Sequence, residues 1–481
     1  MEGQLFTGLE KNKQKFEKIF EQSADFYFKY IQVMGHRGAV VMCEDLASFQ
    51  VLRQVFLHPL NDLPQMKNAV RAFDYIKDST TIPFNSKTAK TFDESVFLLT
   101  AGFALLFLDG INQAFVMSVQ NYPARGVDKP TNENNLRGSK ESFTDTGRKN
   151  MGMIRRRIRS ENLVIKTMQL GEKTKTEVTM YYHSDYCPPQ LAQRVQERLE
   201  NIQLPMIFEA GYISPFVDKT QFSVFQSVGY TERPDTFCAK LCEGRVGVVI
   251  DGTPHRMIYP FYFHENFITN DDYTQRPYFA SFIRLLRYLA FVIAVVLPGF
   301  YVAFTSYAPQ ALADKLIFFI YSSQNATPLP LFVEAVVITI LLEIIKEAGL
   351  RLPVPIGSSA SIVSALIIGD AAVSAGFIGS AILIVCALST VSSFIIPSFY
   401  EPIIIMRMVF IFLAGIFGIP GIAFATFLLA VNIANVDSAG REYSFIFRKG
   451  MKYIFKDGIT RTSWRREKSS PLSGEEGKNE M

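Results

Sequence analysis

Apolar residues are distributed very unevenly along this chain of 481 residues. Residues 288–436 form one apolar run after another with few ionisable side chains between them, whereas residues 1–280 contain no run that a bilayer would accept. A hydrocarbon core of about 30 Å requires roughly 20 consecutive apolar residues in a helix. The pattern therefore predicts a soluble α+β head followed by an all-α polytopic membrane domain.

Basic residues gather at both ends of the apolar region. Arg284 and Arg287 precede it, and the residues that follow it are Arg441, Arg448, Lys449, Lys452, Lys456, Arg461, Arg465 and Arg466. Because cytoplasmic flanks of membrane helices are enriched in Lys and Arg, both ends are predicted to be cytoplasmic, with an even number of crossings between them. The polar, charged start of the chain does not read as a secretory signal.

Four regions follow from these patterns. Residues 1–125 are predicted to form one soluble subdomain and residues 126–280 a second one that begins with a linker. Residues 281–437 form the membrane domain, with four to six apolar segments. Residues 438–481 are a basic cytoplasmic tail, whose interleaved aromatic and basic residues suit a segment lying on the inner leaflet.

Two similar strand–turn–strand patterns occur in the head. Residues 104–108 and 111–119 flank Asp109-Gly110, and residues 246–250 and 253–263 flank Asp251-Gly252. Asp-Gly supplies the positive φ that a tight hairpin requires. The repetition favours two related α+β subdomains, and the competing interpretation is that any two hairpins look alike.

Two charged motifs stand out in the head. Arg155, Arg156, Arg157 and Arg159 are too close together to share one helical face, so some of them must be paired or exposed. In the second motif, formed by Glu232, Arg233, Pro234 and Asp235, the Pro is set to begin a helix. This second pattern is more typical of a turn and helix cap with ion pairs than of a catalytic pair.

The chemistry-bearing residues argue against catalysis. Five cysteines are scattered, and only Cys238 and Cys242 lie one helical turn apart, which is a weak zinc pattern. We find no phosphate-binding loop, no metal cluster and no nucleophile with a neighbouring base. A net charge of +4 is too small to indicate a nucleic-acid partner. We expect no enzymatic activity, cofactor or metal.

Four ionisable residues interrupt the apolar segments: Glu334, Glu343, Asp370 and Arg407. A charge at mid-membrane costs about 2.5–3.5 kcal/mol, so each is a candidate pore or intramembrane site. Glu334 and Glu343 are nine residues apart, which places them on opposite faces of a straight helix. Glu343 has a simpler explanation as a partner of Lys346, which leaves Glu334 as the better candidate for a pore or an intersubunit contact.

Small residues recur at helical spacing between the second and last apolar segments: Gly357, Ser361, Ala365, Gly369 and Gly376. Such a stripe allows close helix packing, and the alternative is a face that lines a water path. The apolar segments number five if each crosses once, which conflicts with two cytoplasmic ends. One segment must be re-entrant, interfacial or doubled, and the Gly/Ser-rich segment and the broken final one are the candidates.

Four stretches, in this order along the chain, resemble the A-subunit family of GerA-type spore germination receptors. They are RGSKESFTDTGRKNMGMIRRRIR, YTERPDTF, EGRVGVVIDGTP and EAGLRLPVPIGSSASIVSALIIGDAAVSAG. The resemblance implies a multi-pass protein of the spore inner membrane that works with a transporter-like B subunit and a lipoprotein C subunit. It further implies a homo-oligomeric channel that releases monovalent cations in response to nutrients.

This chain departs from that family at its start, where the extended hydrophilic region that often precedes the head is missing. A non-conducting scaffold for the B and C subunits remains an alternative. An accessory ion-release channel of the related stage V sporulation type is another. A secondary transporter is disfavoured because no inverted hydropathy repeat is visible.

Overall fold

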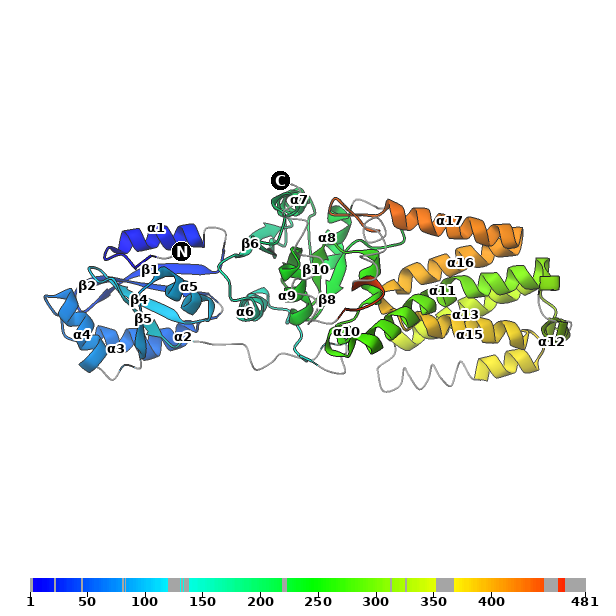
Figure 1. The fold of residues 1–481 in the computed structure, drawn as a ribbon, viewed down its shortest axis with the longest axis horizontal. Helices are drawn as coiled ribbons and strands as arrows, with labels where there is room; N and C mark the ends of the chain where they lie inside the picture. Colours follow the sequence, from blue (N-terminus) through cyan, green and yellow to red (C-terminus); the bar gives the residue numbers. More distant parts are fainter. Residues whose placement is uncertain are drawn as a thin grey trace.

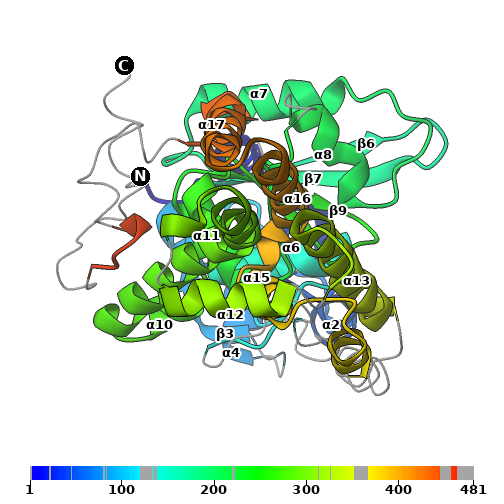
Figure 2. The ribbon, with the colours of Figure 1, turned by 90° about the vertical axis from the view of Figure 1, so that its right-hand side faces the viewer.

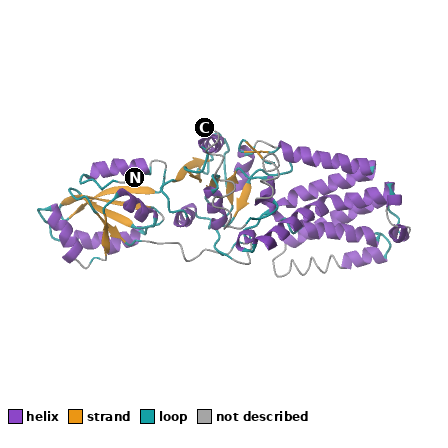
Figure 3. Ribbon diagram, in the orientation of Figure 1, coloured by secondary structure: helices purple, strands orange, loops and turns teal. Residues whose placement is uncertain are grey.

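Two α/β units and a bundle of long helices follow one another in the computed structural model (Figure 1). The structure describes residues 3–20, 23–44, 46–79, 82, 84–119, 130, 133, 138–218, 223–311, 314–324, 327–351, 367–444 and 457–462. The large sheets lie in the N-terminal half and the long helices gather at the opposite end (Figure 3). This arrangement confirms the predicted α+β head followed by an all-α domain.

The first subdomain is a five-stranded antiparallel sheet of order β1-β2-β4-β5-β3 with helices on both faces. Side chains alternate between the two faces, as the period of two in a strand requires. In β2, Val40 and Met42 enter one core and Val41 and Cys43 the other. The elements are α1 (Leu9–Ile19), β1 (Phe26–Val33), β2 (His36–Cys43), α2 (Phe49–Val51), η1 (Leu52–Leu57), α3 (His58–Asn61), α4 (Ala69–Ser79), β3 (Phe84–Ala89), α5 (Phe92–Thr100), β4 (Ala104–Leu108) and β5 (Ala114–Met117).

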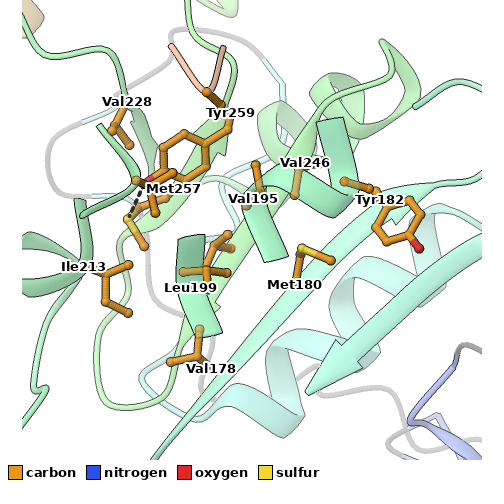
Figure 4. Packing of buried hydrophobic residues seen from close by; sticks show 14 of the residues in the cluster. Val178, Met180, Tyr182, Val195, Leu199, Ile213, Val228, Val246, Met257 and Tyr259 are labelled. Carbon is orange, nitrogen blue, oxygen red and sulfur yellow. Dashed lines mark hydrogen bonds between the residues drawn. The ribbon is translucent and has the colours of Figure 1, made fainter. Parts of the chain in front are cut away.

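The second subdomain has a sheet of order β6-β7-β9-β10-β8, again antiparallel. Its elements are α6 (Gly147–Arg157), β6 (Leu163–Leu170), β7 (Thr176–His183), α7 (Pro189–Glu200), α8 (Ala210–Val217), β8 (Gly229–Thr231), α9 (Pro234–Cys242), β9 (Val246–Ile250) and β10 (Arg256–Tyr259). Figure 4 shows its larger core, where helix and strand side chains interdigitate: Val178, Met180, Tyr182, Val195, Leu199, Ile213, Val228, Val246, Met257 and Tyr259.

The two subdomains share more than the order of their strands. In each, the Asp of the Asp-Gly turn accepts a hydrogen bond from the first backbone N–H of the leading helix: Asp109 from Leu9 at 3.3 Å and Asp251 from Gly147 at 2.7 Å. Asn12 and Asn150, at the fourth position of those helices, each clamp the backbone six residues earlier through two hydrogen bonds. An Asp and an Asn therefore make the same helix-capping and backbone hydrogen bonds at equivalent positions in both subdomains, which confirms two related subdomains.

A buried ion pair joins the two subdomains. Arg155 contributes Nε and Nη2 to the carboxylate of Asp25, both at 3.0 Å, and both side chains are almost fully buried. The Ser23 hydroxyl donates to the Leu163 carbonyl and the Ala24 backbone N–H donates to the Ile165 carbonyl, which extends the joint. The next two arginines, Arg156 and Arg157, pair with Glu141. The arginine cluster is thus largely paired, and one member holds the subdomains together.

The C-terminal half is a helical bundle, seen end-on in Figure 2. Before it come η2 (Phe263–Phe267) and α10 (Asp271–Thr274); after it come the short strands β11 (Asp437–Ser438) and β12 (Arg441–Glu442). The helices are α11 (Pro277–Tyr307), η3 (Pro309–Ala311), α12 (Asp314–Gln324), α13 (Leu331–Arg351), a helical segment at 367–374, α15 (Ser380–Ser393), η4 (Pro397–Phe399), α16 (Tyr400–Phe417) and α17 (Ile419–Asn435). The long helix α11 packs against α13, α15, α16 and α17.

The outside of this bundle is apolar. Two of its helical stretches, Pro277–Tyr307 and Pro397–Phe417, are long and apolar enough to cross a membrane. Large apolar side chains are widely exposed on the bundle, among them Phe282, Leu289, Ile344, Phe417 and Phe427. Contiguous exposed apolar surface of this extent is unusual for a water-soluble monomer and typical of a surface that contacts lipid or another protein.

The final apolar region is a helical hairpin. Gly418 ends α16 with φ at +66°, a conformation that residues with a Cβ rarely adopt, and α17 begins at the next residue. The Tyr307 ring lies against this turn, where a Cβ added at Gly418 would be 2.8 Å from its Cγ. The Tyr307 hydroxyl donates to the carbonyl of Gly415 at 2.5 Å. The region after residue 400 therefore supplies two helices.

Candidate functional site

A proline in α11 creates a free backbone acceptor inside the bundle. Pro298 has no N–H, so the carbonyl of Ala294, four residues earlier, has no partner within its own helix. Ser389 Oγ donates to this carbonyl at 2.8 Å and Arg407 Nε donates to it at 2.9 Å. Helix α11 continues through Pro298, and the neighbouring helices α15 and α16 satisfy the freed oxygen.

Arg407 lies at the centre of this network, which we call the Arg407 centre: Ala294, Glu343, Ser389, Thr390 and Arg407. The guanidinium contacts Glu343 Oε1, Thr390 Oγ1 and the Ser389 carbonyl, each at 3.3 Å. Its side chain is 1% exposed. One arginine from α16 therefore ties α11, α13 and α15 together, and a planar guanidinium with five donors is well suited to do so.

The structure thus brings together two of the predicted intramembrane residues, Glu343 and Arg407. The expected simpler partner of Glu343, Lys346, instead lies over the ring of Tyr400, with Nζ at 3.8 Å from the centroid. Glu343 also lines an open groove of about 590 Å³ between α13 and α16. Its second carboxylate oxygen is buried without a hydrogen bond among the described residues.

Glu334 lies on the other face of α13, as its nine-residue separation from Glu343 indicates. It is fully buried. Its carboxylate accepts hydrogen bonds from Thr327 Oγ1 at 2.5 Å and from the backbone N–H of Gly379, the N-cap of α15, at 3.0 Å. A carboxylate at a helix N-terminus is stabilised by the unpaired N–H groups there. Within one copy, Glu334 therefore positions α15.

Asp370 differs from the other three because its side chain is exposed, on the helical segment 367–374. Of the predicted small-residue stripe, Gly357, Ser361 and Ala365 lie outside the described residues. A Cβ added at Gly369 would be 3.8 Å from Leu383 Cδ2 of α15, and Gly376 has φ at +68° just beyond this segment. The stripe stays a prediction, and Asp370 stays a predicted site without a hydrogen bond or ion pair among the described residues of a single copy.

Closer helix approaches occur at glycines that the sequence reasoning missed. A Cβ at Gly299 would be 2.8 Å from the carbonyl oxygen of Phe410, one at Gly415 would be 2.1 Å from the Phe332 ring, and one at Gly421 would meet the Leu413 carbonyl. These three glycines let α11, α13 and α17 pack closely on α16. Gly299 stands alone beside Pro298, whereas Gly415 and Gly421 each lie three residues from Gly418, a spacing that the sequence reasoning did not use.

The Glu232–Asp235 motif forms a turn and helix start, as predicted. Arg233 is the N-cap of α9 and reaches both carboxylate oxygens of Asp235, at 3.1 and 2.6 Å. It also donates to the backbone carbonyls of Glu133 and Ser139. Asp251 and Gly252 lie elsewhere, at the helix-capping turn of the same subdomain.

The motif borders a cavity of about 710 Å³ between the head and the bundle, which we call the junction cavity. Thr231, Glu232 and Arg233 line it from the head, Arg287 from α11, and Ser398 from the turn between α15 and α16. Burial raises the pKa of the Glu133 carboxyl in its wall, although Thr231 Oγ1 and the Glu232 N–H donate to it. This volume is typical of small-molecule pockets at domain interfaces.

A second set of charged residues forms ion pairs around the N-terminal part of α11. We call this set the charged joint: Asp272, Arg284, Arg287 and Asp457. Arg284 is fully buried and pairs with Asp272 at 3.0 Å and with Asp457 at 2.8 Å; Arg287 pairs with Asp272 at 2.8 Å. Burial raises the pKa of Asp457 despite the neighbouring Arg284. The described tail residues 457–462 thus pack against the head side of α11, while the rest of the tail beyond residue 444 lies outside the described residues.

The described side chains do not form a metal centre or an activated thiol. No group of three His, Cys, Asp or Glu that could hold a metal occurs in the described ranges. Burial raises the pKa of Cys187 and of Cys238 to about 12, so neither is a thiolate near neutral pH. The polar groups instead position helices and join domains, which suits conformational coupling.

A family model described as Bacillus/Clostridium GerA spore germination protein matches residues 14–473. Spore germination protein KA of Bacillus subtilis (strain 168) is 32% identical over 475 residues, covering 98% of this chain and 87% of that protein. Spore germination protein B1 of the same organism is 30% identical over 447 residues, covering 92% of each. The uncharacterized membrane protein YfkQ, also of B. subtilis, is 31% identical, covering 96% of this chain and 90% of that protein.

A solved structure is also similar: the N-terminal domain of the A subunit of the Bacillus megaterium spore germinant receptor GerK3. It is 26% identical, with a TM-score of 0.42, and covers 55% of this chain and 98% of that one.

Proposed function

Because the chain belongs to the GerA family of Bacillus/Clostridium spore germination proteins, we propose that it is the membrane subunit of a nutrient-responsive germination receptor. In this proposal several copies assemble into a gated channel that releases monovalent cations. The channel lies in the spore inner membrane, with head and tail in the cytoplasm. A transporter-like B subunit and a lipoprotein C subunit are its partners.

The observation that carries the channel proposal is the exposed carboxylate of Asp370. Its described neighbours Gly369, Ala371, Ala372, Ser374 and Ala375 are small, and the segment 367–374 has no other charge. Facing lipid at mid-membrane, this carboxylate would cost about 2.5–3.5 kcal/mol. Facing a water-filled path between copies, it would cost little and would attract cations.

The three other intramembrane charges have partners within one copy, which leaves Asp370 as the candidate for a path between copies. Glu334, Glu343 and Arg407 all contact groups of the same bundle, so in one copy they stabilise helix packing. The charged joint fixes α10 and Asp457 of the tail to α11, and the junction cavity is lined by the second subdomain, α11 and the α15–α16 turn. A movement of the head would therefore act on two helices at once.

The first test is the mass of the purified protein in detergent, by mass photometry with the detergent contribution subtracted. We expect a closed ring of several copies. The second test compares Asp370→Asn with Glu334→Gln after reconstitution into liposomes loaded with K⁺. Asp370→Asn should alter K⁺ release while the ring mass stays unchanged, whereas Glu334→Gln should reduce bundle stability. Unchanged K⁺ release by Asp370→Asn would remove the argument for its position at the pore.

The alternative of a non-conducting scaffold is favoured by one observation. The buried polar groups of the bundle are largely satisfied within a single copy, as packing helices rather than a pore would require. A protein that is stable only with its B and C subunits, and that carries no ion current when reconstituted with them, would favour the scaffold. An accessory stage V type channel would conduct ions without any nutrient receptor.

A further inference from the structure

Helix α8 in the second subdomain is apolar on both of its faces. Its sequence, AGYISPFV, contains no charged residue. Ala210, Ile213 and Val217 are buried against the sheet. Tyr212 and Phe216, on the outer face, are each 44% exposed.

Phe208 extends this outer face by one turn. It lies just before α8, is 54% exposed, and contacts the Tyr212 ring edge-on with centroids 6.2 Å apart. Phe208, Tyr212 and Phe216 are spaced by four residues, so their side chains follow one side of the helix. We call these three side chains the aromatic stripe.

The neighbouring helix α7 shows the usual alternative. Its buried side is Leu191, Ala192, Val195 and Leu199, and its exposed side carries Gln193, Glu197 and Glu200. A surface helix of a water-soluble domain normally has such a polar outer face, and a helix that is apolar all round normally contacts lipid or protein on every side. We therefore expect the outer face of α8 to contact either lipid or another protein.

The position of α8 next to the helical bundle favours lipid over a protein partner. Two residues that follow α8 in the sequence contact the bundle: Ser223 Oγ donates to Asn432 Oδ1 of α17 at 2.8 Å, and Gln226 Nε2 donates to Glu401 of α16 at 3.1 Å. Both contacts lie in the helix turns nearest the head. Figure 1 shows α8 beside the same end of α17. Farther along α17, Phe424 and Phe427 are 51% and 61% exposed, on the surface proposed to face acyl chains.

We propose that the aromatic stripe inserts into the headgroup region of the membrane leaflet on the head side, so that the second subdomain rests on lipid beside α17. Aromatic rings are enriched at this depth because they combine a large apolar body with tolerance of a polar boundary. The inference rests on the proposed membrane placement of the bundle and not on ion conduction.

Charge does not drive this contact. Lys173 and Lys175 are exposed in the turn that hydrogen-bonds to residues 204 and 205, but Glu172 in the same turn and Glu209 beside the stripe are exposed as well. The local surface is therefore close to neutral. Insertion should depend on apolar contact and be nearly independent of the fraction of anionic lipid.

The test uses tryptophan fluorescence of the full chain in lipid nanodiscs. The sequence has one tryptophan, Trp464, so Trp464→Phe provides a silent background. Into it we would place Phe208→Trp, Tyr212→Trp or Phe216→Trp, one at a time. These replacements keep an aromatic ring at each position, and three separate variants guard against the failure of one to fold.

Two matched variants calibrate the result. Phe97→Trp, on α5 of the first subdomain, replaces an aromatic side chain that is 59% exposed but distant from the bundle (Figure 1). Phe427→Trp reports the acyl-chain region. Nanodiscs are made with lipids brominated either close to the headgroup end of the acyl chain or deeper along it, and both are compared with unbrominated ones. Acrylamide measures access from water.

We expect bromine to lower stripe fluorescence roughly twofold or more, as for rings that lie about 5–10 Å into the interface, with equal quenching in neutral and anionic nanodiscs. Phe97→Trp should be quenched by acrylamide alone. Stripe tryptophans quenched only by acrylamide would overturn the inference, and stripe tryptophans protected from both quenchers would overturn it in favour of a protein partner. If bromine also fails to quench Phe427→Trp, the membrane placement itself is wrong, which separates the two failures.

Discussion

Replacing Arg407 by Gln should destabilise the helical bundle strongly. The substitution leaves the Glu343 carboxylate buried without its cation and removes the Arg407 donor from the Ala294 carbonyl. Breaking a buried pair by removing one partner typically costs about 3–5 kcal/mol. We expect a loss in that range, because Arg407 is 1% exposed and its partner only 16%.

Two companion variants divide this loss into its parts. In Arg407→Gln/Glu343→Gln no charge is left behind, so about half of the loss or more should be recovered. In Pro298→Ala the helix regains an N–H for the Ala294 carbonyl, so the Arg407 hydrogen bond to that oxygen becomes dispensable. Arg407→Gln should therefore cost about 0.5–1.5 kcal/mol less in the Pro298→Ala background, the typical net contribution of one hydrogen bond, because Ser389 still donates to the Ala294 carbonyl in either background.

The assay follows the bundle alone. Cys386 in α15 is 1% exposed, so its reaction with a thiol dye reports local unfolding of the bundle when the other four cysteines are replaced by serine. Titration with SDS in mixed micelles then gives a free energy for each variant. This choice avoids assuming that the whole multidomain chain unfolds in one step.

Additive losses for Arg407→Gln and Glu343→Gln would refute the reasoning, because residues in contact should couple. A loss below about 1 kcal/mol for Arg407→Gln alone would also refute the reasoning, since it would mean that water reaches the Arg407–Glu343 pair as it reaches an ion pair at a protein surface.

Three further predictions concern other parts of the molecule. Gly418→Ala should lower bundle stability by about 1–3 kcal/mol in the same assay, because a Cβ is strained at φ of +66° and meets Tyr307; an unchanged value would show that the turn rearranges freely. Asp25→Asn should cost the head about 3–5 kcal/mol in urea unfolding, since it strands the buried Arg155, whereas Arg37→Gln at an exposed pair should have no measurable effect. Burial lowers the pKa of His264 to about 3, and Arg245, Lys240 and Arg284 oppose its protonation while Glu265 favours it. Below about pH 6.5 the unfolded imidazole binds a proton that the folded one does not, so stability should fall by up to about 1.4 kcal/mol per pH unit, and His264→Asn should flatten that slope in urea titrations at successive pH values.

The architecture of the head was predictable because its signals are local. Asp109-Gly110 and Asp251-Gly252 mark hairpins by turn chemistry alone, and both glycines have positive φ. The close correspondence of the two subdomains was only partly visible. The Asn12 and Asn150 clamps and the matching strand orders depend on contacts between residues far apart in the chain.

The candidate intramembrane residues were found by a simple rule: a charge in an apolar segment is energetically costly, so it normally has a partner or a function. Their partners were not found. Sequence proximity favoured Lys346 for Glu343, whereas the fold pairs Glu343 with Arg407, 64 residues later. The partners of Glu334 were not visible either, because one of them is the backbone N–H of Gly379, 45 residues away, and a backbone donor has no side-chain signature.

The sequence by itself determined that this chain has a polar α+β head and an apolar helical end, because hydrophobic periodicity and composition are properties of local segments. It also determined the family, since the motifs are contiguous stretches of sequence that can be recognised without knowledge of the fold. Only the tertiary structure decided what the charged residues do. The missing N–H of Pro298 becomes a binding site for Arg407 only once α11, α15 and α16 are packed together, and the outer face of α8 becomes significant only beside α17.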